Sequence, residues 1–286
     1  MPVRGNLQGH MNELETTQHF FSRSVPMCAS FRVSIIIPTK NSSQHISTTI
    51  ENLLQQRNCK FEAIFIDAES TDRTLEIIRS YESSHFRIQS VPKSSRLFEM
   101  VNRGISMAQG EYVSMLFPGD CYLLNDAIAL QMWQIAENNF PDLFYSASFI
   151  RDEWEHEYLL YRPLKRSFLS KGLMPTTIQS SWVKRTLFQR AGYFRSTLSR
   201  RGGLDFFARI VECDKVTIAS EMRVYLEQKP LIRNIPFLLE HCKETFQVIY
   251  THFGLFDAIA YLFVQEDVRQ LFMRLFRRMK FAFQGK

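Results

Sequence analysis

The chain has 286 residues, of which 45% are hydrophobic and 13% aromatic. This composition is typical of a folded globular protein and excludes intrinsic disorder as its main state. No run approaches the roughly 20 apolar residues of a transmembrane helix. Residues 1–30 lack the apolar core of a signal peptide, so we expect a flexible leader there.

The cysteine content and the net charge limit the classes of site and partner. The five cysteines form no Cys-x-x-Cys pair, which disfavours a disulfide framework or a cysteine zinc site and favours reduced thiols in the cytoplasm. A formal net charge of +6 suits anionic partners without selecting among them. Nucleic acid is disfavoured, because no recognised binding module accompanies the charge.

Short β-branched runs alternate with amphipathic helical segments in the first half of the chain. The predicted strands are 33–38, 61–66, 86–91 and 112–117, and the predicted helices are 44–54, 75–81 and 97–108. Such alternation predicts an α/β fold with a mostly parallel sheet flanked by helices on both faces.

Polar residues follow the predicted strands, at the ends where a parallel sheet binds its ligands. They lie in segments 39–41, 67–70, 94–96 and 118–120. Carboxylates and cations occur together in this set, and this mixture suits a nucleotide ligand with its nucleobase, its ribose and a metal-bridged diphosphate. The chain has neither Gly-x-Gly-x-x-Gly nor a P-loop motif, which disfavours a dinucleotide dehydrogenase and a P-loop NTPase.

Four motifs then resemble those of the family 2 glycosyltransferases, which have the GT-A (Rossmann-like) fold. They are a turn with Pro38, Thr39 and Asn41, the loop Asp-Ala-Glu-Ser-Thr-Asp-Arg-Thr at 67–74, Asn-Arg-Gly-Ile at 102–105 and Ala-Gln-Gly-Glu-Tyr at 108–112. The resemblance implies a GT-A domain over residues 31–230. It also implies inverting transfer of a sugar from a nucleotide-diphosphate donor, UDP by default, to an acceptor hydroxyl in glycan or glycolipid biosynthesis.

The resemblance also implies roles for single residues of the donor site. Asp67 matches the acid that contacts the nucleoside of the donor, and the turn at 38–41 lies against the nucleobase. Asp120 matches the last acid of the motif that holds Mn²⁺ or Mg²⁺, which neutralises the charge of the departing diphosphate. Arg96 is a candidate second cation. The structural alternatives are a loop cap for Asp67, a helix cap for Asp120 and a solvated surface position for Arg96.

On the acceptor side, segments 173–194 and 202–209 resemble the family pattern. Asp205 is the remaining candidate for the base that deprotonates the acceptor, because Gly203 stands where that acid usually lies. An acid in the first turn of a helix is also favourable without any chemistry, so both interpretations stay open.

Six positions depart from the family pattern. Gly119, Gly203 and Ala68 replace frequent acids, Ile178 replaces a frequent histidine, and Glu69 and Arg73 replace common glycines. Two hypotheses follow from these departures. Either a shifted set of acids drawn from Asp205, Glu99 and Glu69 performs the transfer, or the domain is a catalytically degenerate binding or accessory protein.

Residues 231–286 are predicted to form a helical extension. Between 268 and 283 apolar residues recur at helical spacing among arginines and a lysine. Such a helix either lies on the inner face of an anionic membrane or packs on the catalytic domain. We therefore expect a saccharide or lipid-linked acceptor and a cytoplasmic protein with peripheral membrane contact. Residues 151–158 are predicted to form an exposed hairpin in which Trp154 stacks on a sugar or packs on the domain.

Overall fold

The computed structural model describes residues 3–4, 32–81, 85–151, 157–211, 217–223, 235–265, 268–269 and 273. The chain divides into two compact units that alternate along the sequence. Unit 1 comprises Met1–Arg162, Thr176–Tyr193 and Lys215–Pro230, and unit 2 comprises Pro163–Pro175, Phe194–Asp214 and Leu231–Lys286. The predicted division into 31–230 and 231–286 stays a prediction, and the predicted leader lies outside the described residues except for positions 3 and 4.

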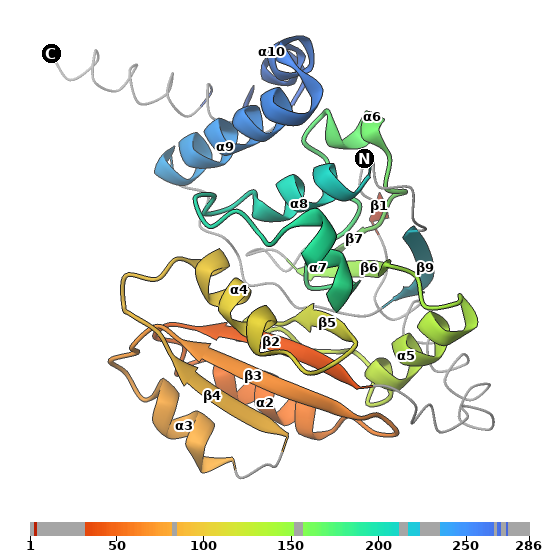
Figure 1. Cartoon of the computed structure of the whole chain (residues 1–286). Helices are drawn as coiled ribbons and strands as arrows, with labels where there is room; N and C mark the ends of the chain where they lie inside the picture. The colour runs from red at the N-terminus through yellow and green to blue at the C-terminus, as the bar shows by residue number, and fades with distance from the viewer. Residues whose placement is uncertain are drawn as a thin grey trace, which may run out of the picture. The chain divides into compact units, whose positions relative to one another are not determined.

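Unit 1 is built on a mixed sheet (Figure 1). Among the described residues the sheet has nine strands, in the order β1-β7-β6-β8-β5-β2-β3-β4, with β9 beside β6. The strands are β1 Val3–Arg4, β2 Val33–Thr39, β3 Phe61–Asp67, β4 Phe86–Ser90, β5 Tyr112–Met115, β6 Leu143–Arg151, β7 Glu157–Leu160, β8 Ser181–Lys184 and β9 Thr217–Arg223. Because β5, β2, β3 and β4 run parallel, their carboxyl ends share one edge of the sheet.

Helices cover both faces of these parallel strands, which confirms the predicted α/β fold (Figure 1). The helices of unit 1 are α2 Ile46–Leu54, α3 Thr74–Ser80, α4 Leu97–Met107, α5 Ala127–Glu137 and α7 Arg185–Ala191. Helix α4 packs on β2 and β3, whereas α2, α3 and α5 contribute to a shared core on the opposite face.

Strand β2 shows how the sequence produces this arrangement. Successive side chains of a strand point to opposite faces, so Ile35 and Ile37 enter one core and Ile36 the other. A methyl group on Gly104 of α4 would overlap the side chain of Ile36, so this glycine allows the helix to lie close to the strand. All three isoleucines are fully buried, as expected of a parallel strand covered on both faces.

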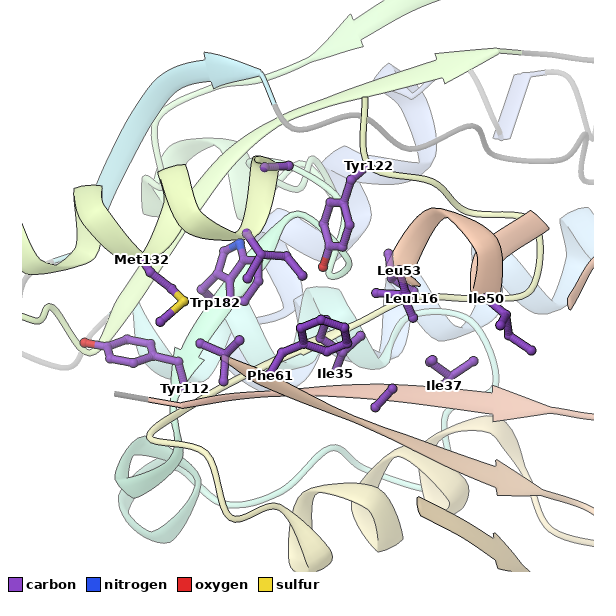
Figure 2. Packing of buried hydrophobic residues seen from close by; sticks show 14 of the residues in the cluster. Ile35, Ile37, Ile50, Leu53, Phe61, Tyr112, Leu116, Tyr122, Met132 and Trp182 are labelled. Carbon is purple, nitrogen blue, oxygen red and sulfur yellow. The ribbon is translucent and has the colours of Figure 1, made fainter. Parts of the chain in front are cut away.

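Figure 2 shows the core that packs on the Ile35 face of the sheet. Trp182 of β8 is fully buried there, and its ring stacks on that of Tyr122 with centroids 6.4 Å apart. Leu53 of α2 and Met132 of α5 belong to the same cluster. The cluster therefore joins β2 and β8 to the helices on this face, and it holds in place the loop that follows β5.

Unit 2 is helical in the described residues. Its helices are α6 Arg166–Leu169, α8 Gly202–Ile210, α9 Ile235–Phe253 and α10 Leu255–Val264. The carboxylate of Glu244 in α9 accepts hydrogen bonds from the N–H groups of Ser199, Arg200 and Arg201, at 2.7, 2.8 and 2.9 Å. A negative charge just ahead of a helix is favourable, so this contact fixes α8 to α9.

The C-terminal helices confirm the predicted helical extension, with a core formed by Leu238, Ile249, Ala258 and Tyr261. No helix in the described part of the chain is long and apolar enough to span a membrane. The predicted basic amphipathic helix over 268–283 lies outside the described residues except at three positions. The central residues of the predicted hairpin, including Trp154, also lie outside them.

Candidate functional site

The ends of β2 and β3 are tied together by Asp67. In the parallel register Thr39 lies beside Asp67. The hydroxyl of Thr39 donates to Oδ1 of Asp67 at 2.9 Å. The backbone N–H of Ser70 donates to Oδ2 at 2.9 Å, and the hydroxyl of Ser70 donates to Oδ1 at 2.6 Å. Asp67 is fully buried, so in this structure its carboxylate holds the loop after β3 against the end of β2.

Asn41 joins the same two loops from the solvent side. Its φ of 49° is left-handed, a conformation that asparagine tolerates better than most residues. Its N–H donates to the hydroxyl of Ser70 at 2.9 Å, and its side-chain oxygen accepts from the N–H of Thr71 at 2.8 Å. Pro38 is buried just before this turn. The structure therefore brings Pro38, Thr39, Asn41 and Asp67 together, with Asn41 as the exposed member.

Asp72 is a further acidic residue of the loop after β3. Its carboxylate accepts from the N–H of Ser43 at 3.0 Å and from both the N–H and the hydroxyl of Thr74, at 3.0 and 2.5 Å. Desolvation acts to raise the pKa of Asp72, but these hydrogen bonds outweigh it and hold the pKa well below its ordinary value. Asp72 therefore stays ionised and cross-links the starts of the two helices that follow β2 and β3.

Arg96 and two of the alternative acids lie on the surface of unit 1. Arg96 is exposed at the N-cap of α4, and its backbone N–H donates to Oε2 of Glu99 at 2.9 Å. Glu99 thus caps the helix. Glu69 is exposed with a φ of 44°. The place of Arg96 in the donor site stays a prediction.

Asp120 lies in the turn after β5 and is 4% exposed. Its Oδ2 accepts from the N–H of Phe117 at 2.7 Å and from the side-chain amide of Gln179 at 3.4 Å. Burial raises the pKa of Asp120 to about 7, although both hydrogen bonds act to lower it. A carboxyl group that titrates near neutral pH is a recognised mark of a functional site.

The same turn explains why glycine stands at 119. The φ of Gly119 is 100°, a conformation that side chains rarely adopt. Its N–H donates to the hydroxyl of Thr49 at 2.8 Å, and this hydroxyl donates to the carbonyl of Asp120 at 3.0 Å. An acid at 119 would therefore strain this turn, and the metal motif is left with one carboxylate.

A single carboxylate limits the kind of metal site that unit 1 can form. Within the described ranges no group of three or more His, Cys, Asp or Glu side chains could hold a metal ion. Mg²⁺ in nucleotide sites is held by one or two carboxylates plus substrate phosphates. Asp120 therefore fits a divalent cation only if the diphosphate of a bound donor supplies further ligands.

Gln179 and a cluster of buried hydroxyls were missed as site residues by the sequence analysis. The hydroxyl of Ser148 in β6 lies 2.8 Å from that of Thr176, 2.7 Å from that of Thr177 and 2.7 Å from that of Ser180. The run of threonines and serines over 176–181 is a signal that could have indicated this cluster. Ser148 gives no such signal, because it lies in the mostly apolar run Leu-Phe-Tyr-Ser-Ala-Ser-Phe-Ile at 143–150.

Asp205 belongs to unit 2, whereas the other predicted site residues belong to unit 1. Its carboxylate is fully buried and contacts two arginines and one histidine. Oδ2 lies 3.0 Å from Nε of Arg209, and Oδ1 lies 2.9 Å from Nε2 of His252 and 3.3 Å from Nε of Arg195. Burial acts to raise the pKa of Asp205, but the hydrogen bond from His252 and the positive charges outweigh it and lower the pKa.

The sequence of this chain is similar to those of glycosyltransferases. Residues 34–197 match the family model described as glycosyl transferase family 2. The glycosyltransferase EpsJ of Bacillus subtilis is 27% identical over 248 residues, which cover 79% of this chain and 72% of that protein. Of seven other curated glycosyltransferases that it matches, the chain spans 18–43% of the length.

Two solved structures share the fold. TarS 1–349 of S. aureus, in complex with UDP-GlcNAc, has a TM-score of 0.62 and 16% identity, covering 86% of this chain and 73% of TarS 1–349. The mannosyltransferase PcManGT of Pyrobaculum calidifontis, in complex with GDP-Man and Mn²⁺, has a TM-score of 0.55 and 18% identity, covering 81% and 74%. At these identities the likeness establishes the fold.

Proposed function

Because this chain belongs to glycosyl transferase family 2, a family of transferase enzymes, we propose that it transfers a sugar from a nucleotide-diphosphate donor to an acceptor hydroxyl. We take UDP as the default nucleotide, inversion as the stereochemical outcome, and glycan or glycolipid biosynthesis as the setting. The observation that carries the proposal is Asp120, a nearly buried carboxyl with a pKa of about 7 at the carboxyl end of β5. Ligands of parallel sheets bind at that edge.

For the nucleoside we propose the paired loops after β2 and β3. TarS and PcManGT hold UDP-GlcNAc and GDP-Man on the same fold, which supports a nucleotide sugar here. Asn41 is exposed, whereas the carboxylate of Asp67 is bonded to Thr39 and Ser70. Asp67 would therefore act on the nucleoside chiefly by holding the loops around the base. Arg96 would add a positive charge for the diphosphate.

We propose Asp120 as the protein ligand of a divalent cation, Mn²⁺ or Mg²⁺. When bound, such an ion would neutralise the charge that develops on the departing diphosphate. The N–H of Phe117 and the amide of Gln179 orient the carboxylate. Since metal binding requires the ionised carboxylate and burial raises the pKa of Asp120 to about 7, metal affinity should rise between pH 6 and pH 8.

For the acceptor side, Asp205 remains our candidate base because of its place in the family pattern. Its contacts with Arg195, Arg209 and His252 lower its pKa, so it could accept a proton only if one of these contacts opened. This observation favours a second candidate function, a catalytically degenerate binding or accessory protein. Gly203, which stands where the base is frequent, favours it as well.

We further propose a saccharide or lipid-linked acceptor and a cytoplasmic protein that contacts the inner face of an anionic membrane. The sequence after Asp267 contains six basic residues and no acidic one. Basic segments of this kind are attracted to anionic lipid by about 1 kcal/mol per charge.

Calorimetric titration with UDP, with and without Mn²⁺, tests the donor site. The three proteins to compare are the wild type, Asp120→Asn and the control Asp126→Asn, which changes a partly exposed acid near the same loop. We expect metal-dependent binding in the wild type and the control, and an affinity at least about tenfold lower in Asp120→Asn. UDP binding that is unchanged by Mn²⁺ and by Asp120→Asn would show that Asp120 serves only to cap its turn. No binding of UDP, GDP or dTDP would favour the degenerate protein.

A further inference from the structure

Helix α10 leaves one apolar face without a partner among the described residues. It lies beside α9 (Figure 1). Ala258 and Tyr261 on its inner side belong to the core that it shares with α9. The opposite side is exposed at Phe256 (86%), Phe263 (85%), Leu255 (56%), Ile259 (45%) and Leu262 (40%). At 3.6 residues per turn these five positions fall within an arc of about 120°, which is the width of the apolar stripe by which a helix packs on a partner.

The composition of α10 strengthens this observation. Asp257 is the only charged residue between Leu255 and Val264. On the helical wheel it lies on the side away from the exposed arc. Two phenylalanines at more than 80% exposure, about two turns apart on the same face, are a large departure from an ordinary surface, on which apolar side chains are scattered singly.

The size of the face favours a lipid surface over a second copy of the chain. Large apolar side chains bury roughly 150–250 Å² each, so five at these exposures present on the order of 500 Å². Stable protein interfaces bury about 800 Å² per partner. By contrast, a single amphipathic helix is sufficient for an interfacial membrane contact, where it sinks roughly 5–10 Å into the headgroup region.

The charge of the following sequence complements such a surface. From Val268 to the last residue the chain has six basic residues and no acidic one. Arg269, the first of these, is exposed. Glu266 and Asp267 separate α10 from this basic segment. An apolar helix face followed within a few residues by a basic segment combines two attractions of peripheral membrane proteins, namely burial of apolar side chains and attraction to anionic headgroups.

We propose that the exposed face of α10 inserts into the interfacial layer of an anionic lipid bilayer. The helix lies along the membrane and does not cross it. This surface is made of other residues than the proposed donor site and the basic segment after Asp267, and the proposal rests on the membrane contact proposed above. It makes Phe256 and Phe263 the anchors that hold unit 2 on the membrane.

Vesicle sedimentation with the full chain tests the proposal. Vesicles of phosphatidylcholine with phosphatidylserine are compared with vesicles of phosphatidylcholine alone. The variants are Phe256→Ser/Phe263→Ser and, as a control, Leu54→Ser, which removes an apolar side chain that is 45% exposed at the end of α2. We expect binding to the anionic vesicles, a partition coefficient lower by about a hundredfold in the double variant, and no change in the control.

A second variant reports insertion directly. In Phe263→Trp, the tryptophan fluorescence should shift to shorter wavelength when anionic vesicles are added. Calorimetric UDP binding should be the same in all these variants, so a failed donor site and a failed membrane contact remain distinguishable.

Three outcomes would overturn the proposal. They are no binding of the wild type to anionic vesicles, equal binding of the wild type and the double variant, and no spectral shift in Phe263→Trp. A concentration-dependent dimer in solution that the double variant abolishes would also overturn it, since a second copy would then cover the face.

Discussion

Replacing Asp120 by asparagine should stabilise the protein while removing the proposed metal ligand. The carboxyl is 4% exposed, and burial raises its pKa from the ordinary 3.8 to about 7. Each pH unit between the two values corresponds to about 1.4 kcal/mol of preference for the neutral form. Ionised Asp120 therefore lowers the free energy of unfolding by up to about 4 kcal/mol, and the neutral amide of asparagine avoids this loss.

The sign of the pH dependence follows from the same values. Between pH 3.8 and about 7 the folded chain keeps the proton of Asp120 while the unfolded chain releases it. Stability from this group is thus fully present below the unfolded pKa and is lost as the pH rises through the folded pKa. The advantage of Asp120→Asn should be close to zero at pH 4, grow up to about pH 7 and stay constant above it.

Urea denaturation of the wild type and Asp120→Asn from pH 4 to pH 8.5 measures this difference. Asp126→Asn is the control. Because Asp126 is partly exposed, this substitution should change the free energy of unfolding by less than about 0.5 kcal/mol across the same pH range. An Asp120→Asn variant that is no more stable than the wild type at pH 8 would refute the reasoning. A difference that is the same at pH 4 and pH 8 would also refute it.

Four further substitutions test two buried charges, one half-exposed ion pair and one close approach. Asp205→Asn should lower the free energy of unfolding by about 3–5 kcal/mol, because it removes the buried carboxylate that pairs with Arg195 and Arg209 and contacts His252. Glu240→Gln on α9 breaks a half-exposed ion pair and should cost less than about 1 kcal/mol, and equal losses in urea would contradict the argument. Burial acts to raise the pKa of Glu62, but its hydrogen bonds and the charge of Arg87 outweigh burial and lower it, so the contribution of Glu62 to stability is lost as the pH falls. Glu62→Gln should therefore lower the free energy of unfolding by about 2 kcal/mol at pH 7, and the stability of the variant should depend less on acid than that of the wild type. Urea denaturation of both proteins at pH 7 and pH 4 would check this. Gly110→Ala would place its methyl group 2.6 and 2.7 Å from backbone atoms of β2 and should cost about 1–3 kcal/mol, and an unchanged melting temperature would contradict this clash.

The local elements of unit 1 were predictable because periodicity is a property of neighbouring residues. The predicted strand 33–38 is β2 Val33–Thr39, and the predicted helix 97–108 is α4 Leu97–Met107. The edge of the sheet at which Asp67 and Asp120 lie follows from the same pattern, since parallel strands end at a common edge.

The partners of the candidate site residues were not predictable from the sequence. Gln179 reaches Asp120 from 59 residues away, and His252 reaches Asp205 from 47 residues away. No local pattern encodes such pairs, because they depend on how separate elements pack. These partners change the interpretation, since they make Asp205 an ion-paired group with a lowered pKa and Asp120 a carboxyl that titrates near neutrality.

The sequence by itself determined the family, the α/β fold and the acids that mark the edge of the sheet, because these depend on short motifs and on local hydrophobic patterning. Only the tertiary structure decided how deeply each acid is buried and which hydrogen bonds it accepts. It also decided that segments 163–175 and 194–214 pack in one unit with the C-terminal helices, and that one face of α10 is left exposed. The physical reason is that burial and charge pairing arise from contacts between residues far apart in the chain, and these contacts set both pKa values and exposed surface.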